Sequence, residues 1–177
     1  MAVTIDGTNG ITVDTIGTIY PLVRMTAQNS TSGTVIDFTG IPSWAKRLTV
    51  LFNGVSTTGV SAYLIQIGTV TSIENTGYVS GVSSIQGTNA TAATSSTAGY
   101  ILQNAAVAAS TYSGVVTIHN VSSNIWVSAG MLHANNGLGY FSSGNKTLAG
   151  VLTRVRITTV NGTDAFDAGS VNVMYEG

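Results

Sequence analysis

Side chains able to do acid–base or nucleophilic chemistry are few in this 177-residue chain. It holds two histidines, seven Asp and Glu, six Lys and Arg, and no cysteine. His119 or His133, with Asp164 or Asp167 and one of many serines, could be combined into a hydrolytic triad. Serines are so frequent that such proximity is expected by chance, and no Gly-x-Ser-x-Gly turn is present to hold a nucleophile. We therefore predict that the chain is not an enzyme.

Oxygen-rich residues near the C-terminal end, Asn161, Asp164 and Asp167, have the ligand chemistry that a hard cation such as Ca²⁺ prefers. Their spacing does not match an EF-hand, and Asp and Asn side chains commonly stabilise their own turns. A pair of carboxylates for glycoside hydrolysis is equally unsupported, because most of the acids stand next to turn residues. The segment 139–147 approaches a phosphate-binding loop but has one residue too many before Lys146. We predict turn stabilisation here, with no metal and no cofactor.

Aromatic residues offer the better candidates for a contact site. Tyr140 and Phe141 stand among Gly, Ser and Asn, in a segment that we interpret as a loop. Exposed rings provide contact area at low entropic cost, which suits recognition of a glycan or a protein. We predict that Tyr140 and Phe141 contact a receptor, or pack across a subunit interface. Trp44 and Trp126 adjoin or lie in strand-like segments, and we expect both to be structural.

The charge content is the most informative feature of the composition. Asp, Glu, Lys and Arg make up 7% of the chain, against about 25% in an ordinary soluble domain. The net charge of −1 provides no basic field for nucleic acid. The start lacks the pattern of a secretory signal, and no apolar run is long enough to span a membrane. We expect a protein that is not inserted in a membrane and that covers part of its surface by self-assembly.

The rest of the sequence favours an all-β fold. Gly, Ser, Thr, Val and Ile dominate, and apolar residues alternate with polar ones, so that Val155 and Ile157 are expected to face inward while Arg154 and Arg156 face outward. The segment 105–109 is the best helical candidate but is short and uncapped. An antiparallel β-sandwich of jelly-roll type is therefore predicted. Its expected strands are 34–38, 47–52, 62–67, 100–102 (the weakest), 114–119, 125–132, 152–159 and 170–175.

Two kinds of segment stand apart from these strands. Residues 1–30 contain short strand-like pieces that are too few to form a core, and we predict an N-terminal attachment arm there, with the sandwich domain over 31–177. Residues 68–97 are rich in Ser, Thr, Ala, Asn and Gly, and periodicity fades within them. We expect 68–97 and 135–147 to be loops displayed outward.

A resemblance is carried by Ile36-Asp37-Phe38-Thr39-Gly40-Ile41-Pro42-Ser43-Trp44-Ala45-Lys46-Arg47-Leu48-Thr49-Val50, by residues 52–56 and by residues 156–170. These segments resemble a module of bacteriophage tail-fibre and related virion proteins. The opening residues 3–11 are similar to the start of many phage fibre proteins. The resemblance implies a β-sandwich that trimerises on a virion, attaches through its N-terminus to other virion proteins, and contacts the host surface through distal loops.

We therefore expect a homotrimeric tail-fibre or adhesion module located in the virion. Because the chain is far shorter than a typical long fibre, a capsid head-fibre or decoration protein is the closest alternative. A glycan-cleaving tailspike-type enzyme is a second alternative, from another functional class. A lectin-like module of cellular origin is a third, weakened by the lack of a signal segment.

Overall fold

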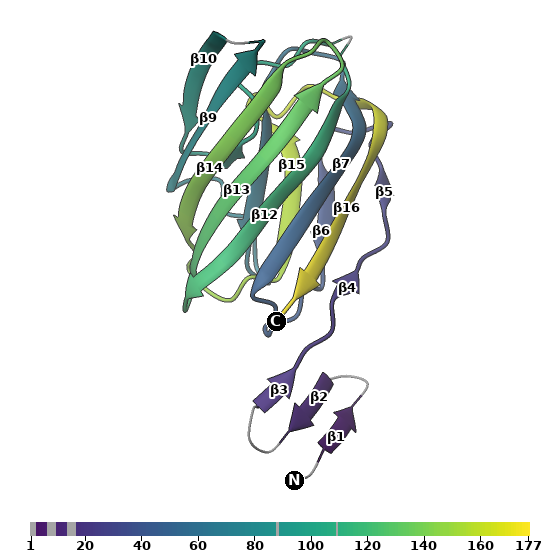
Figure 1. Cartoon of the computed structure of the whole chain (residues 1–177), viewed down its shortest axis with the longest axis vertical. Coiled ribbons are helices and arrows are strands. Elements are labelled where there is room, and N and C mark those ends of the chain that lie inside the picture. The colour runs from purple at the N-terminus through teal and green to yellow at the C-terminus, as the bar shows by residue number, and fades with distance from the viewer. Residues whose placement is uncertain (1–2, 7–9, 14–16, 88, 109) are drawn as a thin grey trace.

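The computed structural model describes residues 3–6, 10–13, 17–87, 89–108 and 110–177 (Figure 1). These residues form strands joined by turns and irregular segments, and there is no helix among them. Every strand pair is antiparallel. The predicted all-β antiparallel sandwich is confirmed.

Two sheets form the sandwich. The larger has nine strands in the order β10-β9-β14-β13-β12-β7-β16-β4, with β5 also paired to β16, and the smaller has the order β11-β8-β15-β6. The larger sheet consists of β4 (Val23–Arg24), β5 (Gln28–Asn29), β7 (Arg47–Thr57), β9 (Tyr78–Gln86), β10 (Asn89–Ser96), β12 (Tyr112–Ser122), β13 (Ile125–Ala134), β14 (Gly139–Thr147) and β16 (Phe166–Glu176). The smaller consists of β6 (Ile36–Thr39), β8 (Tyr63–Gly68), β11 (Tyr100–Ile101) and β15 (Arg154–Thr159).

The chain passes repeatedly from one sheet to the other. It crosses at each step from β6 through β7 and β8 to β9, again from β10 through β11 to β12, and finally from β14 through β15 to β16. Such crossings are typical of jelly-roll-like sandwiches. The three strands β12, β13 and β14 instead follow one another within the larger sheet as a meander (Figure 1).

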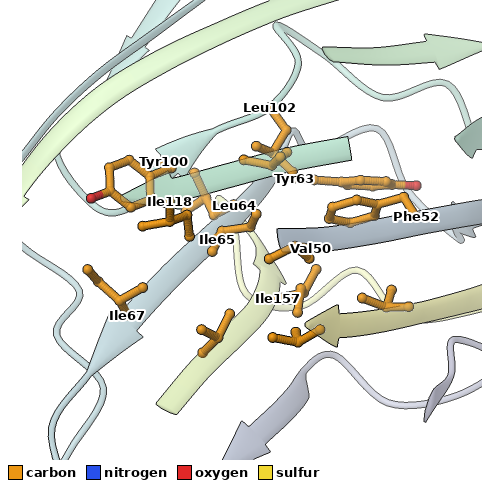
Figure 2. Close-up of a cluster of buried hydrophobic side chains, with 14 of the residues drawn as sticks. Val50, Phe52, Tyr63, Leu64, Ile65, Ile67, Tyr100, Leu102, Ile118 and Ile157 are labelled. Atoms are coloured by element: carbon orange, nitrogen blue, oxygen red, sulfur yellow. The ribbon is translucent and has the colours of Figure 1, made fainter. Parts of the chain in front are cut away.

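The core lies between the two sheets. In β6, β12 and β13 buried and exposed side chains alternate along much of each strand, so each contributes one face to the core. Figure 2 shows apolar side chains from both sheets meeting there, including Val50 and Ile118 from the larger sheet and Ile65 and Ile157 from the smaller. As predicted, Val155 and Ile157 are fully buried and alternate along β15 with the outward-facing Arg154 and Arg156. Alternation of apolar residues therefore located these strands correctly.

Tyrosines fill much of the same interior. Tyr63 packs edge-on against Tyr112 at 5.3 Å between ring centroids, and Tyr112 lies 6.0 Å from Tyr140. Tyr78 packs edge-on against Tyr100 at 5.1 Å. Hydroxyl groups find partners inside: the Tyr78 oxygen accepts a hydrogen bond from the Ile67 N–H (2.8 Å). Burial raises the pKa of all five tyrosines, that of Tyr140 to about 12.

The structure corrects two predicted loops. Residues 78–86 and 89–96 form the paired strands β9 and β10, and residues 139–147 form β14, an interior strand of the larger sheet. In both, small residues that are common in loops occupy strand positions, because cross-strand hydrogen bonds fix them there. The helical candidate at 105–108 is irregular, and residue 109 lies outside the described residues.

The N-terminal region divides into two parts. A separate three-stranded sheet is formed by β1 (Val3–Asp6), β2 (Gly10–Val13) and β3 (Gly17–Ile19), and it projects from the sandwich beside the C-terminus (Figure 1). Farther along, β4 and β5 pair with β16, so they belong to the larger sheet although they fall within the predicted arm 1–30. Residues 1–2, 7–9 and 14–16 of that arm lie outside the described residues.

Candidate functional site

One side of the nine-stranded sheet is turned away from the smaller sheet, and none of the described residues forms a layer over it (Figure 1). We call this side the outer face. It consists of the outward-pointing residues of the adjacent strands β9, β14, β13, β12, β7 and β16. Strand register places these residues in rows that run across the sheet, so each row can be traced from one strand to the next.

The central row of the outer face is apolar. Phe141 of β14 stands opposite Met131 of β13, Met131 opposite Val115 of β12, and Val115 opposite Leu51 of β7. Phe141 is 48% exposed, Met131 56% and Val115 42%. The row ends in polar residues on both sides, with Ser83 of β9 next to Phe141 and Asn172 of β16 next to Leu51. Large apolar side chains are therefore displayed at the middle of the sheet, with the exposed Ser83 at one end of the row and the buried Asn172 at the other.

Further apolar residues stand on both sides of the central row, with small or polar residues such as Ser143, Ala129 and Thr117 between some of them and that row. Ile125 and Val127 of β13, and Val79 and Ile85 of β9, are all exposed. Beside Phe141, a hollow of about 290 Å³ extends the surface toward β10. Its lining residues are Gly81, Val82, Ser83, Ala93, Thr94, Phe141 and Ser143. The outer face thus has one continuous apolar row across β14, β13 and β12, with separate apolar residues on either side of it.

Ionised groups are nearly absent from the middle of this face. Lys146 of β14 points inward, where its Nζ lies 2.6 Å from a Glu74 carboxylate oxygen and 5.4 Å from the centre of the Tyr78 ring. The ion pair between Arg47 and Glu176 lies at the β7–β16 side of the sheet. The solvent side of an antiparallel sheet is ordinarily polar. An apolar, uncharged face of this kind marks an interaction surface.

The structure separates the two aromatic candidates. Tyr140 is 1% exposed and packs in the core, whereas Phe141 lies on the outer face. Both are in β14, where successive side chains point to opposite sides of the sheet. The prediction that they share an exposed loop is therefore wrong. A contact role remains a prediction for Phe141, and burial leaves Tyr140 no accessible ring.

Asn161, Asp164 and Asp167 lie in the β15–β16 connection and at the start of β16, and they make turn-stabilising contacts. The Asp164 carboxylate accepts hydrogen bonds from the Ser61 N–H (2.9 Å) and from Asn161 Nδ2 (2.6 Å). The Asn161 side-chain oxygen accepts bonds from two backbone N–H groups of the same turn. Asp167 accepts a bond from the Ser56 hydroxyl. Across the described residues, no three His, Asp or Glu side chains gather as a metal site would require.

The imagined catalytic residues are not brought together. His119 and His133 both lie on the outer face, but their register places them six strand positions apart, or about 20 Å. Neither histidine shares a hydrogen bond with Asp164 or Asp167 in the part of the chain that the structure describes. Three of the other acids, Asp37, Glu74 and Glu176, form ion pairs with basic residues.

Sequence reasoning missed the outer face itself. Its signal was present as the consecutive apolar pairs Leu51-Phe52 and Tyr140-Phe141, together with Val115-Val116 and Met131-Leu132. In a strand such a pair places one apolar residue on each side of the sheet. A strand that alternates strictly would have placed a polar residue at each of the outward positions.

No protein-family model, curated protein or solved structure matches the chain. The described residues contain no helix that is long and apolar enough to cross a membrane. The resemblance to virion fibre modules therefore remains a prediction from the sequence.

Proposed function

We propose that the chain is a structural protein of a bacteriophage virion, a trimeric tail-fibre or adhesion module that contacts the host surface and breaks no bond. The observation that carries this proposal is the apolar, nearly uncharged outer face on a chain with only 7% charged residues. A sheet that exposes such a face requires a partner to cover it. A multi-subunit particle supplies that partner.

Adhesion of this kind depends on the number of copies. Several weak contacts on one particle bind far more tightly than one contact does, because each later contact forms at high effective concentration. The turn between β13 and β14 lies at the end of the sandwich remote from β1–β3, as Figure 1 shows. There the Gln86 side chain of β9 donates a hydrogen bond to the Asn136 carbonyl (3.4 Å). We assign host contact, with a surface glycan or protein, to this distal end.

The N-terminal sheet supports the attachment role. It precedes the sandwich as a separate unit and projects from the end opposite the β13–β14 turn (Figure 1). A unit with this placement can bind other virion proteins while the distal turns stay accessible. Deleting residues 1–19 should leave the sandwich folded and remove the protein from assembled particles. Particles that incorporate the shortened chain normally would contradict the attachment role.

Mass in solution is the first test of the whole proposal. We expect three times the chain mass of 18.1 kDa by sedimentation velocity, maintained on dilution. A single folded chain at high dilution would overturn the trimeric fibre. Labelling the protein in intact particles then distinguishes the two virion locations, because label at the tail supports adhesion and label on the shell supports a head fibre or decoration protein.

A further inference from the structure

We infer that copies of this chain associate through the outer face, with the Phe141–Met131–Val115 row at the centre of the contact. This inference rests on the proposed trimer and assigns the surface that holds it together. The N-terminal sheet is the competing means of assembly, since a trimer could form through β1–β3 alone.

The arrangement of residues fits a subunit contact. Interfaces have an apolar centre that is depleted of charge and a polar rim. The central row has such a centre, with three exposed apolar side chains, and the exposed Ser83 stands at its β9 end. Met131 is the most exposed of the three, and it lies in β13, a middle strand of the sheet.

The size of the face also fits. Strands β9, β14, β13, β12 and β7 have nine to eleven residues each. At about 4.8 Å between strands and about 3.3 Å per residue, five such strands present roughly 700 Å². A stable protein–protein interface buries about 800 Å² on each partner. Because each copy of a trimer has two neighbours, three such faces that meet at the axis would together bury about 2,100 Å², above the total of about 1,600 Å² in a standard two-body interface.

The lack of charge on the outer face indicates which kind of partner can cover it. A nucleic acid or a strongly charged protein would need opposite charges, and the middle strands β13 and β14 display no ionised Lys, Arg, Asp or Glu outward. Other copies present the same uncharged apolar centre, so in a trimer three outer faces can meet around the three-fold axis, each in contact with both neighbours. The Met131 and Phe141 side chains of the three copies would then pack together near that axis.

Charge insertion tests the contact in the full chain. Met131→Glu should weaken association by about 30-fold or more, the loss that a central contact residue produces. Val151→Glu is the matched control, because Val151 is 51% exposed in the β14–β15 connection, away from the outer face. It should leave the mass unchanged. Sedimentation velocity over a dilution series gives both values, and unchanged far-ultraviolet circular dichroism confirms that both variants fold.

A labelling experiment gives the same answer without disturbing the contact. The chain has no cysteine, so Met131→Cys and Val151→Cys each introduce a single thiol. In the assembled protein, a maleimide reagent should modify the first at least 10-fold more slowly than the second, and denaturation should make the two rates equal. Equal rates in an intact trimer would overturn the inference and leave the proposed function standing. A wild-type chain that stays monomeric would overturn both.

Discussion

The two sides of the nine-stranded sheet are built from neighbouring residues of similar character and meet opposite environments. On the inner side, Leu132 and Tyr140 are each 1% exposed. Their sequence neighbours Met131 and Phe141 point to the outer side and are about half exposed. The smaller sheet covers the inner side only. Burial in this protein is therefore decided by which layer covers a residue, and the hydrophobicity of the residue does not predict it. The outer side has an apolar central row and lacks a covering layer, so it is the part of the molecule available for assembly.

The largest expected difference between the two sides is in their response to alkaline pH. Burial raises the pKa of the inward tyrosines, that of Tyr140 to about 12, from an unfolded value near 10. Above about pH 10 the unfolded chain releases protons that the folded chain retains, so the folded state loses stability as pH rises. Each such tyrosine contributes a slope of up to about 1.4 kcal/mol per pH unit. Urea unfolding at several values between pH 9 and 12 should therefore show a steep loss.

The Tyr140→Phe variant is the control for this slope. It removes one titrating group from the core and retains the ring, so between about pH 10 and 12 the fall in stability with pH should become shallower by at most about 1.4 kcal/mol per pH unit. Phenolate absorbance measured in the same samples reports ionisation directly. Appearance of phenolate from all the tyrosines near pH 10, while the chain is still folded, would contradict the burial of this cluster.

Truncation of adjacent aromatic residues is the next most sensitive comparison. Tyr140→Ala should lower the free energy of unfolding by about 3–5 kcal/mol, because it empties space in the core. Phe141→Ala should cost the protomer less than about 1 kcal/mol, because one side of this ring already contacts solvent. Both substitutions should be made in a chain that also carries Met131→Glu, so that association does not contribute to the measured free energy of unfolding. Urea denaturation gives the two numbers, and equal losses would show that Phe141 is covered within its own chain.

Tyr140 and Phe141 also show how far the sequence alone predicts this structure. The strand that contains Val155 and Ile157 was predicted because charged arginines separate its apolar residues. In β14 the same alternation is hidden, since Tyr140 and Phe141 are both apolar and their neighbours are small. The sequence therefore predicts the sandwich and most of its strands. It does not predict which side of a doubly apolar strand is covered, because that depends on the packing of distant segments.

Substitution of Lys146, the inward-pointing lysine of β14, should lower the free energy of unfolding by less than Tyr140→Ala does. Lys146 and Glu74 are both shielded from solvent, and the Glu74 carboxylate also accepts a hydrogen bond from the Ala149 N–H (2.8 Å). Lys146→Met should destabilise the fold by about 2 kcal/mol, the scale of a lost hydrogen bond to a charged group. The double variant with Glu74→Gln should recover part of this loss, because the carboxylate then no longer lacks its cation. Thermal unfolding of the three proteins checks the order.

Loss of the ion pair between Arg47 and Glu176 should change the free energy of unfolding least. Arg47 and Glu176 are paired across β7 and β16, but their side chains are 48% and 27% exposed, so water and salt already screen the attraction. Arg47→Gln should change the free energy of unfolding by about 0.5 kcal/mol or less, and by less still in 1 M salt. A loss comparable to that of Lys146→Met would mean that this margin is buried in the assembly. The outer face would then extend as a contact surface beyond its apolar centre to β16.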